Sequence, residues 1–176
     1  MRSPELQAIS VLSKDLNLNL TINQLSKELK KSYGFTNKYI NEFIDEGILS
    51  KKVVGSAILC SLNFSNEKTI GLLMLNSVDE KIAYMKTADK KTKETLDIIK
   101  NTPSIKTFFL ADGKINVICE DKAAAQAYLM EHLSNQKITI LEKTEFKLQL
   151  KNLDLKNTVI IEGYEQFWRM ISEMMS

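Results

Sequence analysis

The chain has 176 residues, enough for one large domain or two small ones, and its hydrophobic content of 44% suffices for a folded core. A net charge of +2 excludes an argument for nucleic-acid binding from bulk charge alone. The sequence shows no signal-peptide leader and no run of 18 uninterrupted apolar residues, so we expect a cytoplasmic protein that does not cross a membrane.

Charge and cysteine placement add two expectations. Residues 1–62 carry eight Lys/Arg against six Asp/Glu, whereas residues 104–176 carry nine against ten, so the N-terminal part is the more basic. Cys60 and Cys119 lie in apolar alternating runs without CxxC spacing, and His132 has no potential ligand at metal-binding spacing. We therefore expect two buried thiols, no metal site and no cofactor.

The first 31 residues predict a helix, a short strand and a second helix. Apolar residues recur at helical spacing over residues 4–14, and alternation over residues 16–20 favours a strand. Thr21 is a typical N-cap with Gln24 completing a capping box, so the second helix should run from about Ile22 to Lys31.

Gly34 is expected to mark a turn, with a third helix beginning near Thr36. Ile40, Phe43 and Ile44 would form its buried stripe. That leaves three polar residues on the outer side near its start, Asn37, Lys38 and Asn41. Asn and Lys are suited to reading bases or holding phosphates in the major groove; the alternative is that they are simply solvated.

Gly47 should end this helix, and two strands should follow around a Gly-Ser turn. Lys51, Lys52 and Ser56 are placed to anchor such a hairpin on a phosphate backbone. The complete set of predicted DNA-binding residues is Thr36, Asn37, Lys38, Asn41, Lys51, Lys52 and Ser56.

The run Ile40, Phe43, Glu46-Gly47-Ile48-Leu49, followed by Lys51-Lys52, Gly55 and Leu62-Asn63, resembles the recognition helix and wing of archaeal and bacterial winged-helix transcription regulators. The similarity covers about residues 5–63. It implies a DNA-binding domain over residues 1–64 with double-stranded DNA as partner, acting as a homodimer. Many winged helices bind RNA or protein instead, and that alternative stays open.

Residues 65–102 are rich in helix formers and predict a helical connector, either one long helix or two helices broken near Asn76-Ser77. The polar, Lys-rich stretch 88–95 is expected to mark the domain boundary. The apolar part from Ile70 to Met85 is equally suited to packing within its own chain and to pairing with a second copy.

Residues 103–176 predict a small α/β domain with a mixed sheet, so the chain as a whole is of the α/β (α+β) class. Strands are expected over 105–111 and 114–120 around the Asp112-Gly113 turn, then over 137–141 and 158–161. Helices are expected from Asp121 to Leu133, near 143–150, and at the end of the chain around Phe167, Trp168 and Ile171.

The order of these elements, with Thr144-Glu145-Phe146 and Val159 to Phe167, resembles a minimal nucleotidyltransferase fold. The resemblance implies a Gly-Ser phosphate grip and an Asp-x-Asp magnesium site. Here Leu110-Ala111 and Lys114-Ile115-Asn116 stand at those places, and they supply neither the grip nor two carboxylates. We therefore predict a non-enzyme.

The favoured hypothesis is a transcription regulator whose second domain mediates dimerisation or binds a protein or small-molecule effector. The alternatives are a nucleotidyltransferase with a relocated active site and a winged helix that contacts only protein or RNA.

Overall fold

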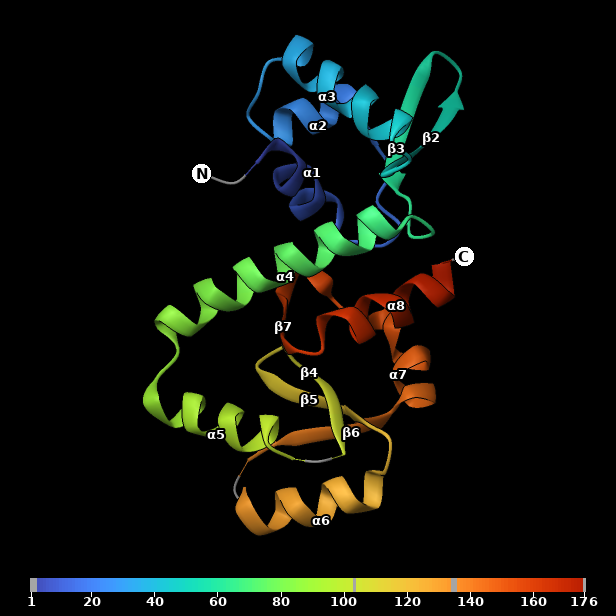
Figure 1. Cartoon of the computed structure of the whole chain (residues 1–176). Helices are drawn as coiled ribbons and strands as arrows, with labels where there is room; N and C mark the ends of the chain where they lie inside the picture. The colour runs from blue at the N-terminus through green and yellow to red at the C-terminus, as the bar shows by residue number, and fades with distance from the viewer. Residues whose placement is uncertain (1–2, 103, 134–135, 176) are drawn as a thin grey trace. The chain divides into compact units, whose positions relative to one another are not determined.

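The computed structural model describes residues 3–102, 104–133 and 136–175, so the end residues of the predicted domains 1–64 and 103–176 lie outside the described residues. Over the described residues the chain forms eight α-helices and two small sheets, which confirms a mixed α+β class (Figure 1). None of the helices described is long and apolar enough to cross a membrane.

The chain divides into two compact units, described separately below. The N-terminal unit contains the described residues up to Asn76 together with Met175, and the C-terminal unit contains Ser77–Met174. The division falls inside one helix, α4 (Glu67–Thr87), which is continuous. The predicted connector consists of two helices, as one of the two alternatives had it, but the break lies after Thr87 and before Lys90 rather than near Asn76-Ser77, which lie inside α4.

The N-terminal unit has three helices and a three-stranded sheet. They are α1 (Pro4–Leu12), β1 (Leu20–Thr21), α2 (Ile22–Glu28), α3 (Tyr33–Asp45), β2 (Leu49–Val54) and β3 (Ala57–Leu62). The strand order is β1-β3-β2, and both pairings are antiparallel. Ile9, Leu25, Ile40 and Leu73 fill its core, so the first part of α4 packs within its own chain.

Local signals place most of these boundaries. The predicted capping box at Thr21 and Gln24 is present. The second helix ends at Glu28 rather than Lys31 because Lys30 adopts a positive φ of 53° and reverses the chain. The third helix begins at Tyr33 rather than Thr36, since Ser32 accepts a hydrogen bond from the Phe35 N–H and caps it there. Gly34 lies inside that helix and makes no turn.

The C-terminal unit begins with the second part of α4 and contains four strands and four further helices. These are α5 (Lys90–Lys100), β4 (Ile105–Ala111), β5 (Lys114–Cys119), α6 (Lys122–His132), β6 (Ile138–Glu142), α7 (Lys143–Gln149), β7 (Thr158–Glu162) and α8 (Tyr164–Met175). The Lys-rich stretch 88–95 is mostly the start of α5, which is capped by Asp89.

The sheet of this unit has the order β6-β5-β4-β7, with β5 and β6 parallel and the other pairs antiparallel. The predicted mixed sheet is confirmed, as is the Asp112-Gly113 turn, where both residues have positive φ.

Helices cover both faces of this sheet. On one face Phe108 packs with Ile99 of α5 and Leu129 of α6. On the other, the rings of Phe109, Phe146 and Phe167 lie within 5.3–5.5 Å of one another, which brings α7 and α8 together. Because successive strand residues point to opposite faces, the Phe108-Phe109 pair supplies both layers of the core.

Candidate nucleic-acid interface

The third helix, α3, is fixed firmly at its C-terminal end. Gly47 has a φ of 71°, and the Ile48 N–H donates to the Phe43 carbonyl at 2.8 Å, which completes a Schellman cap. Asn63 Nδ2 donates to the Gly47 carbonyl at 2.7 Å, and Asn66 Nδ2 donates to the Glu46 carbonyl at 3.1 Å. These side chains follow the hairpin, so they tie the helix end to the segment between β3 and α4.

The inner side of α3 is formed by Thr36, Tyr39, Ile40 and Phe43, all buried. Thr36 is 0% exposed and therefore cannot touch a nucleic acid, so its prediction as a DNA-binding residue is wrong. It lies one position from the polar face but on the packed side of the helix. Burial raises the pKa of the neighbouring Tyr39 hydroxyl, and the Thr36 hydroxyl partly offsets that effect.

Lys38 and Asn41 are exposed on the outer side of α3, and Asn37, one turn before Asn41, is half-buried. Asn41 Nδ2 donates to the Asn37 carbonyl at 2.8 Å and to Asn37 Oδ1 at 3.2 Å. Asn37 Nδ2 and Asn41 Oδ1 take no part in these two hydrogen bonds. One donor and one acceptor on neighbouring turns are the groups that an adenine edge requires.

The sign of charge changes along α3. Lys38 lies in its first half, whereas Glu42 and Asp45 are exposed in its second half. The N-terminal end of a helix also carries the positive end of the helix dipole. An approaching polyanion is therefore favoured at the start of α3 and disfavoured at its end.

Two lysines that sequence reasoning did not select strengthen this end of the helix. Lys30 and Lys31 are exposed in the turn between α2 and α3, directly before the Ser32 cap. Exposed aromatic side chains, Tyr33 at 55% and Phe35 at 49%, stand in the first turn beside them. The signal was present as a Lys-Lys pair before a Ser N-cap, but the prediction placed Lys30 and Lys31 at the end of the second helix and began the third helix three residues too late, at Thr36.

The hairpin of β2 and β3 turns through Gly55-Ser56, with Gly55 at a φ of 60°. Lys51, Lys52 and Ser56 are exposed, as contact with a nucleic acid requires. Lys51 is paired with Cys60 and Lys52 with Leu59, so the two lysines point to opposite faces of the hairpin. A DNA duplex that lies against one face of the hairpin can therefore contact one of these two lysines, but not both.

The tip of the hairpin is apolar, which sequence reasoning also missed. Val53 is 67% exposed, Val54 51% and Ile58 39%, and Val53 is paired with Ile58 across the hairpin. The third strand of the sheet, β1, is two residues long and pairs only with Cys60 and Leu59 of β3. It therefore extends the sheet only at the base of the hairpin and leaves the tip exposed.

The remaining predicted chemistry lies elsewhere. Leu110 and Ala111 face Ile115 and Lys114 across the two-residue β4–β5 turn. His132 is exposed on α6 and its ring stacks on Tyr128 at 4.1 Å. Within residues 3–102, 104–133 and 136–175 no group of three or more His, Cys, Asp or Glu side chains is arranged to hold a metal ion.

Comparison of the chain with protein-family models, with curated proteins and with solved structures finds no match.

Proposed function

We propose that the N-terminal unit binds double-stranded DNA and that the protein is a transcription regulator. The single observation that carries this proposal is the composition of the start of α3. Exposed Lys30 and Lys31 precede the capped start of α3, and exposed Lys38 and the hydrogen-bonded pair Asn37 and Asn41 follow in its next two turns. Cations and a helix N-terminus hold phosphates, and an amide pair reads a base edge, so the two parts of recognition lie on one helix end.

On this proposal the β2–β3 hairpin lies beside the groove as a wing and contributes one lysine to the backbone. A second copy of the chain would double these contacts on a two-fold symmetric site, with recognition helices about 34 Å apart. The lone lysines of one unit would otherwise give weak binding, because each phosphate contact adds little at physiological salt.

The test is fluorescence polarisation of labelled duplex DNA titrated with the full chain at several salt concentrations. Lys30→Ala combined with Lys31→Ala should weaken binding to every duplex and lower the slope of log K against log salt by about 0.9 for each lost phosphate contact. Lys156→Ala removes one exposed charge from the C-terminal unit and serves as the control, which should bind as the wild type does. A flat salt dependence for the wild type would contradict the proposal.

Asn37→Ala and Asn41→Ala should act differently from the lysine changes. They should reduce the preference for the best sequence over a scrambled one, by about 1–3 kcal/mol if the pair reads a base. Thr36→Val, in the interior, should leave both affinity and preference unchanged.

The apolar hairpin tip favours a second candidate function, binding of a protein through Val53, Val54 and Ile58. Replacing Val53 and Ile58 by Ser distinguishes the two. Lost association with a protein partner at unchanged DNA affinity would support the second candidate, whereas lost DNA affinity would place the tip in a groove.

A further inference from the structure

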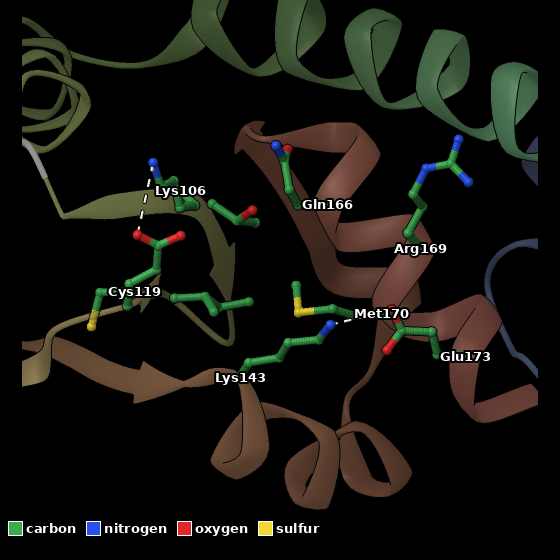
Figure 2. A pocket seen from close by; sticks show the side chains of 10 residues that line it. Lys106, Cys119, Lys143, Gln166, Arg169, Met170 and Glu173 are labelled. Carbon is green, nitrogen blue, oxygen red and sulfur yellow. Dashed lines mark hydrogen bonds and ion pairs between the residues drawn. The ribbon is translucent and has the colours of Figure 1, made fainter.

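The C-terminal unit contains a cavity of about 260 Å³ between the end of its central hairpin and helices α7 and α8 (Figure 2). It is bounded by Lys106 and Thr107 of β4, by Ile118 and Cys119 of β5, and by Lys143 at the start of α7. The side of α8 that carries Gln166, Met170 and Glu173 closes it. This cavity shares no residue with the proposed DNA interface.

The floor of the cavity is apolar. Ile118, Cys119 and Met170 are buried, with 4–5% of their surface exposed. The two polar atoms of the floor are already satisfied, because the Thr107 hydroxyl donates to the Gly163 carbonyl at 3.2 Å and the Cys119 thiol donates to the Leu141 carbonyl at 3.6 Å. The apolar part of a ligand would therefore be stabilised on this floor by the hydrophobic effect.

The rim of the cavity is charged, with an excess of cations. Lys106 lies 3.9 Å from Glu120, while Lys143 and Lys147 share one carboxylate, Glu173, at 3.2 and 2.6 Å. Hydrogen bonds from Lys147 and Lys143 lower the pKa of Glu173, so that carboxylate is ionised at neutral pH. The lining residues comprise three cations, Lys106, Lys143 and Arg169, and two carboxylates, Glu120 and Glu173, which leaves one positive charge over. Adding the ion-pair partners outside the lining, Lys147 and Glu165, gives four cations against three carboxylates and the same surplus.

Two backbone features shape this end of the sheet. The β4–β5 pairing shifts between Ile105 and Thr107, so Lys106 is the extra residue of a bulge. Gly163, which has a φ of 72°, packs directly against Lys106 and Thr107. A Cβ at position 163 would overlap the Lys106 carbonyl oxygen and Thr107. The bulge and the glycine together turn Lys106 to the rim and let α8 begin beside it.

We propose that this cavity binds a small organic monocarboxylate, with a compact apolar body on the floor and its carboxylate between Lys106 and Lys143. The size fits such a ligand, since a cavity of about 150 Å³ holds benzene and 260 Å³ has room for a ring with a short chain. One carboxylate also matches the single surplus positive charge. The site goes beyond the proposed DNA binding, and its test requires no DNA.

The test uses the full chain and three probes with the same body, 3-phenylpropanoate, 3-phenylpropan-1-ol and 3-phenylpropylamine. Calorimetry should give the carboxylate a dissociation constant on the order of 100 µM. The alcohol and the amine should bind at least about fivefold more weakly, and raising the salt should weaken only the carboxylate. Amide NMR shifts should be confined to residues around the cavity. Equal binding of all three probes, no binding, or shifts elsewhere would overturn the proposal.

A matched pair of variants tests the role of the rim. Lys143→Met and Lys147→Met each remove one charge and one partner of Glu173, but only Lys143 lines the cavity. Lys143→Met should weaken carboxylate binding about threefold to tenfold, with Lys147→Met within twofold of the wild type. Equal weakening by both would show a general charge effect and refute direct contact. Unchanged Trp168 fluorescence verifies that each variant is folded.

Discussion

The two β-hairpins of this protein share several local features but lie in different environments. Both have six- or seven-residue strands, a two-residue turn with a positive-φ glycine, and a buried cysteine near the open end. The β4–β5 hairpin lies between β6 and β7 and is covered by helices on both faces, whereas the β2–β3 hairpin is exposed beyond its base. Neighbouring elements, rather than the hairpin itself, decide which hairpin belongs to a core and which is available to a partner.

Truncation of an apolar side chain should give the largest difference in the free energy of unfolding between the two hairpins. Phe109→Ala in β4 removes a ring that touches Phe146 and Phe167 and should cost about 3–5 kcal/mol in the free energy of unfolding. Val53→Ala at the other hairpin tip should change it by less than about 0.5 kcal/mol. Urea unfolding followed by Trp168 fluorescence reports the C-terminal unit, and circular dichroism reports the whole chain. Similar losses for both variants would contradict the assigned burial.

Replacing the positive-φ glycines Gly163 and Gly55 by alanine should give the next largest difference in the free energy of unfolding. Gly163→Ala places a methyl group against the Lys106 carbonyl and forces a positive φ on alanine, so we expect a loss of about 2–5 kcal/mol. Gly55→Ala has the same conformational penalty but open space around it, so about 1–2 kcal/mol is expected. The same unfolding measurements apply, and a cost for Gly55→Ala at least as large as that for Gly163→Ala would rule out steric overlap as the cause.

A smaller effect separates the two lysines of the exposed hairpin. Because Lys51 and Lys52 point to opposite faces, one of the single alanine variants should lower the salt slope of DNA binding by about 0.9 while the other leaves it unchanged. Fluorescence polarisation across a salt series measures both. Equal reductions in the two variants would mean that DNA wraps the hairpin or that the strand register differs.

The smallest effect concerns the two thiols. Burial raises the pKa of Cys60 and Cys119, and Glu142 raises that of Cys119 further, so both are protonated in the folded chain at pH 8. The folded chain holds the two thiol protons more tightly than the unfolded chain does. The thiols therefore contribute fully to stability below the ordinary thiol pKa, and that contribution is lost as pH rises through the raised pKa. With a disulfide reagent at pH 8, Cys60 in Cys119→Ser should react faster than Cys119 in Cys60→Ser, since the exposed hairpin opens locally. The reverse order would place the weaker hairpin in the C-terminal unit.

Sequence alone determined the identity and order of nearly all elements. The Thr21-Gln24 capping box, the Gly47 cap, the Asp112-Gly113 turn and the Asp121 cap are local interactions within a few residues, so they can be read directly from the chain. The outward placement of Lys38 and Asn41 followed equally from helical periodicity.

Tertiary structure decided what those elements face. The burial of Thr36, the opposition of Lys51 and Lys52, the uncovered tip at Val53 and the unbroken α4 depend on which residues pack alongside, and no local pattern specifies that. The cavity by Lys106 likewise needs a bulge, Gly163 and two helices that are distant in sequence. Caps and turns are short-range hydrogen bonds and helical periodicity separates the two sides of one helix, so both could be predicted from the sequence. Which neighbours cover a given side is a sum over long-range contacts, and that could not.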